Sequence, residues 1–111
     1  AYQTFDLFEA MKHDGLRPRL VKVDGGMVMN NWFSQFLSDV VNVGVLRPKV
    51  RETTALGAAF MAGLQIGVYK SLKDISKNWS LDKKFSPKMK SISRSKLLKG
   101  WSKAINRTLI N

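Results

Sequence analysis

Two hydrophobic periods alternate along the first 67 residues of this chain. Phe5, Phe8 and Met11 recur at threefold spacing, which is typical of an amphipathic helix over residues 4–13. Residues 19–24 carry a leucine and two valines and end at a glycine pair, which predicts a buried strand. Because such a chain buries both kinds of element by packing helices onto a sheet, we expect an α/β layer that forms about half of a larger one.

The alternation continues through the next 20 residues. Four apolar residues have the spacing i, i+3, i+4, i+7 of a helix that packs on a sheet; they are Phe33, Phe36, Leu37 and Val40. They predict a helix over residues 32–41, which Asn30 or Asn31 can cap. Residues 43–46 predict a second strand, and Arg47-Pro48 closes it, because proline lacks the N–H that a strand needs.

The later segments are less regular. Residues 55–64 predict a third helix, rich in alanine and glycine. Each glycine destabilises a helix by about 1 kcal/mol relative to alanine, so we expect packing to compensate and this helix to lie inside the protein. Residues 70–95 are rich in Lys and Ser and predict an extended connection with one short turn around residues 72–75. A final amphipathic helix is expected over residues 93–109.

Positive charge is concentrated in the second part of the chain. Residues 1–67 contain seven Lys or Arg and six Asp or Glu, whereas residues 68–111 contain twelve and two, so the net charges are +1 and +10. Few aromatic residues interrupt the lysines, which favours a solvated face over a nucleic-acid or anionic-membrane site. No apolar run approaches the roughly 20 residues that cross a bilayer. We therefore expect no nucleic-acid partner and no membrane span, and a basic, non-enzymatic binding module remains the alternative.

The residue inventory excludes several kinds of active site. The chain has no cysteine and one histidine, His13, so thiolate catalysis and metal ligation by paired histidines are excluded. His13 lies in a polar turn, where a solvated side chain is expected. The acidic residues are dispersed, and of those before residue 68 only Asp24 ends an apolar strand. We therefore predict neither a catalytic residue nor a metal ligand within this chain.

The segment from Val23 to Asn30 carries the most chemical information. It combines a strand end, the pair Gly25-Gly26 and a helix start. Glycines let a ligand approach the backbone, and free amides at a helix start attract negative charge or hydrogen-bond acceptors. The spacing matches neither the dinucleotide-binding nor the P-loop pattern. A tight turn without a ligand explains the generic pattern equally well.

Motifs in register along nearly the whole chain resemble those of one enzyme family. They are Val23-Asp24-Gly25-Gly26 with Asn30-Asn31, then Arg47-Pro48, Glu52-Thr53-Thr54-Ala55-Leu56-Gly57-Ala58-Ala59, Phe85-Ser86-Pro87 and Gly100-Trp101. In this order they resemble the FGGY carbohydrate kinases and, within them, the glycerol kinase group. The xylulose and gluconate kinases of the family share the glycine pair and remain alternatives.

The resemblance implies an α/β fold, part of an actin-like (ribonuclease H-like) ATPase domain, followed by a basic tail with a C-terminal helix. Residues 1–75 would be the later part of the C-terminal nucleotide-binding domain, and residues 76–111 a basic connection and an amphipathic helix. For ATP it implies that Gly26 contacts the nucleotide through its backbone, Gly25 allows the close approach and Asn30 hydrogen-bonds adenine. Gly57 and Ala58 would either wall this pocket or pack helix against sheet.

The resemblance also implies phosphorylation of glycerol by ATP in a cytoplasmic homo-oligomer. The family's catalytic aspartate and Mg²⁺ site correspond to upstream segments, so the missing N-terminal part of the enzyme is an expected partner and this fragment alone is expected to be inactive. Asp24 would order the loop and would not act as the base. The tail departs from the family pattern, because residues 86–95 carry no acidic residue, which weakens any inference of regulatory contacts there.

Overall fold

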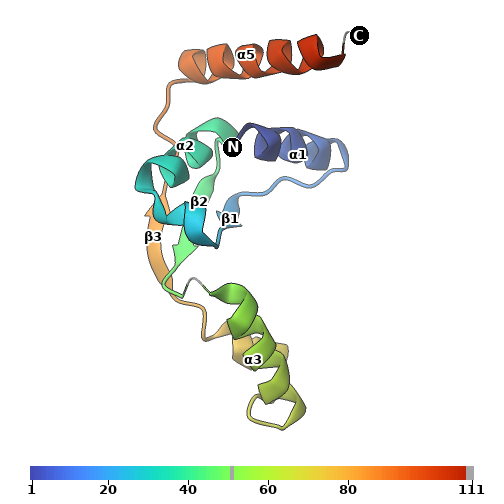
Figure 1. Cartoon of the computed structure of the whole chain (residues 1–111), viewed down its shortest axis with the longest axis vertical. Helices are drawn as coiled ribbons and strands as arrows, with labels where there is room; N and C mark the ends of the chain where they lie inside the picture. Colours follow the sequence, from blue (N-terminus) through green and yellow to red (C-terminus); the bar gives the residue numbers. More distant parts are fainter. Residues whose placement is uncertain (51, 110–111) are drawn as a thin grey trace.

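The computed structural model describes residues 1–50 and 52–109 (Figure 1). The helices are α1 (Tyr2–His13), the 3₁₀ turn η1 (Gly26–Met29), α2 (Asn31–Val41), α3 (Thr53–Gln65), α4 (Leu72–Ser76) and α5 (Ser91–Leu109). The strands are β1 (Leu20–Lys22), β2 (Gly44–Pro48) and β3 (Leu81–Phe85). The alternation of helix and strand predicted from the hydrophobic periods is confirmed.

The three strands form one sheet in the order β1-β2-β3. β1 and β2 run parallel, with Leu20 opposite Gly44, and the chain crosses from one to the other through η1 and α2. β3 pairs antiparallel with β2 and places Phe85 opposite Val45. Because β1 and β2 are parallel, their carboxyl ends lie at the same edge of the sheet, where ligands bind in many α/β proteins.

Helix α2 packs on β2 and β3, and α1 packs on α2. The buried apolar residues of this core come from both helices and from β2 and β3; they are Phe8, Leu37, Val41, Val45 and Phe85. Phe5 and Met11 are partly buried against them, as their spacing in the sequence predicts. Burial of one such side chain stabilises the fold by about 1.5–3 kcal/mol, so this cluster fixes both helices on the sheet.

Helix α2 has defined ends. The Oδ1 atom of Asn30 accepts hydrogen bonds from the backbone N–H groups of Trp32, at 2.9 Å, and Phe33, at 3.2 Å. Asn30 is therefore the N-cap, one of the two candidates that the sequence offers. Asn42 follows the last turn in the left-handed conformation, with φ 55°, which asparagine adopts more readily than most residues.

Two expectations about burial are wrong for this chain. Leu20 in β1 is 52% exposed, because β1 is an edge strand and α2 packs on the other two. Helix α3 was expected to lie inside, but of its residues only Gly63 is buried. It extends away from the sheet (Figure 1). The ring of Tyr69 packs against it, with its centroid 5.5 Å from that of Phe60. In the described chain no second layer covers its small residues.

The prediction of an extended connection over residues 70–95 is also wrong. The short turn is confirmed as α4, which Ser71 caps by accepting a hydrogen bond from the Asp74 N–H at 3.2 Å. The strand β3 follows. Only Phe85 of its five residues is buried, so β3 lacks the apolar alternation that reveals a half-buried strand. The strand forms because its backbone hydrogen-bonds to β2. This pairing depends on tertiary structure and not on the local sequence pattern.

The C-terminal helix is confirmed as α5. Leu97, Leu98, Trp101 and Ile105 are its half-buried apolar residues. Trp101 stacks on Tyr2 of α1, with ring centroids 5.4 Å apart, and its Nε1 donates to Asp6 Oδ2 at 2.7 Å. Helix α5 thus docks on α1. The domain boundary at residue 75 stays a prediction, although β3 beyond it belongs to the same sheet as β1 and β2.

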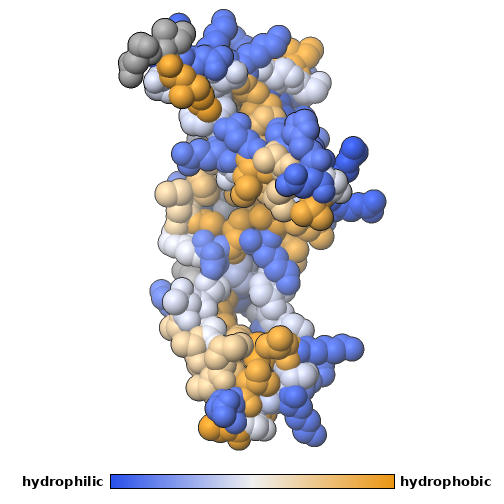
Figure 2. Space-filling view, turned by 90° about the vertical axis from the view of Figure 1, so that its right-hand side faces the viewer, coloured by the Kyte–Doolittle hydropathy of each residue, from blue (hydrophilic) through white to orange (hydrophobic). Residues whose placement is uncertain are grey.

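The chain is elongated. Its extents are 54 × 31 × 27 Å and its radius of gyration is 17.5 Å, whereas a compact domain of this length has about 13 Å. Hydrophobic surface is exposed in several places, including the end formed by α3 (Figure 2). None of the helices in residues 1–50 and 52–109 is long and apolar enough to cross a membrane.

Candidate functional site

The glycine pair lies just beyond the carboxyl end of β1. The Val23 N–H still donates to the Leu46 carbonyl of β2 at 3.0 Å, and the chain then turns at Gly25, which has φ 87° and ψ 174°. Residues with a side chain rarely adopt this conformation, so Gly25 is required by the turn. Gly26 begins η1 and has a negative φ, and a Cβ built on it meets no atom within 4 Å. Its backbone therefore faces open space that a ligand can reach.

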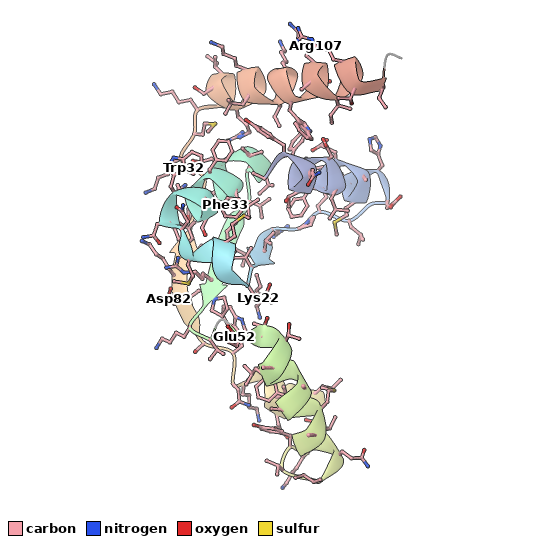
Figure 3. The ribbon with its side chains drawn as sticks, viewed as in Figure 1. Lys22, Trp32, Phe33, Glu52, Asp82 and Arg107 are labelled. Carbon is pink, nitrogen blue, oxygen red and sulfur yellow. The ribbon has the colours of Figure 1, made fainter. Side chains whose placement is uncertain are left out.

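A hollow of about 490 Å³ opens beside the pair. Two segments line it: the loop after β1 and the start of α3. They supply Asp24, Gly25, Gly26, Met29, Glu52, Thr53 and Thr54. The hydroxyl of Thr53 donates a hydrogen bond to Asp24 Oδ2, which ties the two segments together. Glu52 lies at the same end of the sheet as Lys22 of β1 (Figure 3).

The hydrogen bond from Thr53 bears on the role of Asp24. A carboxylate that accepts from a residue 29 positions away fixes the two sides of the hollow relative to each other. The contact agrees with the loop-ordering role expected for Asp24. In the sequence, Glu52, Thr53 and Thr54 belong to a family motif and carry no separate sign of a site. Only the tertiary fold brings the start of α3 to the glycine loop.

The structure places the three expected nucleotide contacts in two groups. Gly25 and Gly26 line the hollow, whereas Asn30 does not. Asn30 lies at the adjoining start of α2, with its Oδ1 engaged in the cap. If Asn30 contacts adenine, the contact is therefore expected from its Nδ2 amide hydrogens. Gly57 and Ala58 do not line the hollow either.

Metal-binding groups are sparse. In the part of the chain that the structure describes, no cluster of three or more His, Cys, Asp or Glu residues can hold a metal ion. His13 is exposed at the end of α1, in agreement with the expected solvated side chain. Asp24 and Glu52 are the acidic residues of the hollow, and two carboxylates there disfavour phosphate groups and suit hydroxyl donors.

The family comparison agrees with this geometry. Residues 1–66 match the model of the C-terminal domain of the FGGY family of carbohydrate kinases. The chain belongs to this family. Both the family expected from the sequence motifs and the actin-like ATPase fold that it implies are confirmed.

Individual relatives agree with the assignment. The chain is 52% identical over 106 residues, 96% of its length, to glycerol kinase 1 of Pseudomonas aeruginosa. The structure of Plasmodium falciparum glycerol kinase with ADP matches 99% of the chain with a TM-score of 0.79 and 35% identity. A xylulose kinase of Lactobacillus acidophilus matches 96% of it with a TM-score of 0.79 and 22% identity, which supports the fold alone. The chain spans 22%, 22% and 23% of the lengths of these three proteins.

Proposed function

We propose that this FGGY chain is the adenosine-binding, C-terminal part of a glycerol kinase, an enzyme that phosphorylates glycerol with ATP to glycerol 3-phosphate. The observation that carries the proposal is the 52% identity to a glycerol kinase over 96% of the chain. Identity to the xylulose kinase neighbour is 22%, so xylulose and gluconate kinases are the weaker alternatives.

The hollow beside the glycine pair fits adenosine better than it fits phosphates. Open space over Gly26 lets a flat base or a sugar approach the backbone. The hydroxyls of Thr53 and Thr54 and the carboxylates of Asp24 and Glu52 offer partners for ribose hydroxyl groups. A triphosphate would meet two negative charges there. We therefore assign adenosine to Gly25, Gly26 and Asn30, with the phosphates pointing away from this hollow.

In the proposed reaction ATP supplies the phosphoryl group, and Mg²⁺ would neutralise charge on the phosphates, as in phosphoryl transfer generally. This chain contributes positioning: the glycine loop presents its backbone to adenosine, the contact between Thr53 and Asp24 holds the loop against α3, and Asn30 offers its amide hydrogens. The Mg²⁺ ligands and the base that accepts the glycerol proton are assigned to other parts of the enzyme.

The remaining parts of the enzyme are the partners that we propose for this chain. Its elongated shape and the exposure of large apolar residues such as Met61 and Ile66, 52% and 76% exposed, support packing against further protein. A cytoplasmic homo-oligomer is part of the proposal. A basic, non-enzymatic module is disfavoured because the 52% identity to a glycerol kinase extends over 96% of the chain and so includes most of the lysine-rich segment.

The test is to express the complete enzyme that carries this segment and to measure ATP-dependent phosphorylation of glycerol, D-xylulose and gluconate in parallel. We expect glycerol to have the highest kcat/KM. A preference for xylulose or gluconate would replace the substrate assignment. Absence of phosphoryl transfer to all three, in a folded protein, would remove the proposed function.

A further inference from the structure

A buried arginine lies beneath the glycine loop. Arg47 of β2 is 6% exposed. Its Nε donates to Asp82 Oδ2 of β3 at 2.7 Å, and the ring of Phe85 lies 5.4 Å from the guanidinium carbon. A buried cation is tolerated only when charge and hydrogen bonds compensate its desolvation. Asp82 supplies the charge, and it lies on β3 (Figure 3).

The other bonds of the guanidinium reach the loop that carries the expected nucleotide contacts. The Nη1 atom of Arg47 donates to the carbonyl oxygen of Val28 at 3.0 Å, to that of Met29 at 3.3 Å and to Asn31 Oδ1 at 3.1 Å. These acceptors lie on both sides of Asn30 in the sequence. Two of them belong to η1, whose first residue is Gly26. The guanidinium therefore fixes the backbone between the glycine pair and the helix start.

A second buried donor acts on the same loop. The hydroxyl of Ser34, which is fully buried, donates to the Val28 carbonyl at 2.9 Å. Ser34 comes from α2, whereas Arg47 comes from β2, so two elements converge on one carbonyl. The loop conformation is thus set from below by side chains that do not line the hollow.

We propose that Arg47, neutralised by Asp82, is a positioning residue that holds the loop from Gly26 to Asn31 in the conformation that binds ATP. The inference rests on the proposed function and adds to it a residue that acts through the loop without contacting the nucleotide. It also gives β3 a role: Asp82 keeps the guanidinium oriented, so a strand outside the family-model match determines ATP affinity.

Lysine cannot replace arginine in this role. The fork of the guanidinium bonds Asp82 through Nε and the loop through Nη1, whereas an ammonium group presents its donors from a single atom. Without these bonds the nucleotide-free loop populates other conformations, and the apparent affinity falls in proportion to the fraction of molecules that keep the binding conformation. A fraction of about one tenth corresponds to a roughly tenfold loss of affinity. We therefore expect Arg47→Lys to raise the KM for ATP and the Kd for ADP about tenfold, with kcat and the KM for glycerol within about twofold of wild type.

The experiment compares Arg47→Lys, Asp82→Asn and Arg94→Lys in the complete enzyme. The Asp82 side chain is 40% exposed and its replacement by asparagine keeps the size of the side chain, so this variant should fold. It should shift ATP affinity in the same direction, by a smaller factor. Arg94 is the matched control: its guanidinium bonds the carbonyls of Asp39, at 2.7 Å, and Met89, at 3.1 Å, away from the glycine loop. Arg94→Lys should lower the melting temperature and leave the KM for ATP unchanged.

Each outcome supports or overturns the inference. If Arg47→Lys and Asp82→Asn lower the melting temperature as Arg94→Lys does, with ATP and ADP affinities unchanged, Arg47 is only structural and the inference is wrong. If Arg47→Lys does not fold, a raised ADP Kd in Asp82→Asn supports the inference and an unchanged ADP Kd overturns it. The same two results decide the inference if the wild-type enzyme phosphorylates a substrate other than glycerol. If it binds no ADP at all, the proposed function and this inference fail together.

Discussion

Asn30 offers the sharpest test of the expected adenine contact, because its two possible roles use different atoms. Its Oδ1 caps α2 through the N–H groups of Trp32 and Phe33, at 2.9 and 3.2 Å. The proposed contact with adenine uses Nδ2. Asn30→Asp keeps an oxygen for the cap and removes the amide hydrogens, and its negative charge is favourable at a helix N-terminus by about 0.3–1 kcal/mol. The variant therefore separates the two roles.

The expected magnitudes follow from these contacts. Asn30→Asp should leave the melting temperature of the nucleotide-free enzyme close to wild type, whereas Asn30→Ala, which removes the cap, should destabilise it by about 1 kcal/mol. Loss of one hydrogen bond to adenine costs about 0.5–1.5 kcal/mol, which is a roughly two- to twelvefold loss of affinity. We expect the KM for ATP to rise by that factor in both variants, while the KM for glycerol changes little.

The assay combines thermal unfolding without nucleotide and steady-state kinetics at varied ATP and saturating glycerol. Asn42→Asp is the matched control, since Asn42 lies at the opposite end of α2 and is exposed. It should not change the KM for ATP. If Asn30→Asp also keeps wild-type ATP kinetics while Asn30→Ala loses stability, Asn30 is a cap only and its contact with adenine has to be withdrawn.

Three further predictions concern the glycine pair, the isolated chain and the tail. Gly25→Ala should lower the melting temperature because φ is 87° there. Gly26→Ala should leave the melting temperature unchanged and raise the KM for ATP several-fold, because it places a methyl group at the hollow. Equal effects of the two substitutions on the melting temperature would contradict this prediction. The 111-residue chain alone should not phosphorylate glycerol, and turnover by the pure chain would refute that expectation. Replacing Lys88, Lys90 and Lys96, which are exposed, with glutamine should keep kcat/KM of the complete enzyme within about twofold, and a larger loss without unfolding would show that these lysines act in the mechanism.

Local sequence pattern predicted the elements whose stability is local. Helix α2 has an apolar stripe that includes Leu37 and Val40 and an asparagine cap, and each of these signals works within a few residues. The turn at Gly25 was predictable for the same reason, since only glycine adopts its backbone conformation readily. Family motifs then supplied the fold and the expected ligand, which the generic pattern left open.

Burial was harder to predict, because it depends on what lies next to an element. The small residues of α3 suggested an interior helix, but the described chain provides no layer to cover it, and most of its residues, such as Met61, are exposed or half-buried. The leucine and valines of β1 suggested a buried strand, but β1 is an edge strand here. The apolar composition of an element shows how much surface it can bury. It does not show whether a neighbouring element is present to cover that surface.

The strand β3 is not predicted from the sequence because the charged residues that suggest a solvated connection include one that supports the fold. Residues 82–84 are Asp-Lys-Lys, which indicates a solvated connection when read as composition. In the fold, the Asp82 carboxylate faces Arg47 at 2.7 Å and Phe85 closes the core. Within the five residues of this edge strand, solvated lysines therefore lie next to residues that support the fold. This is why we expect opposite results from neighbouring parts of the same basic segment: neutralising the lysines of the tail leaves ATP affinity unchanged, whereas neutralising Asp82 weakens it.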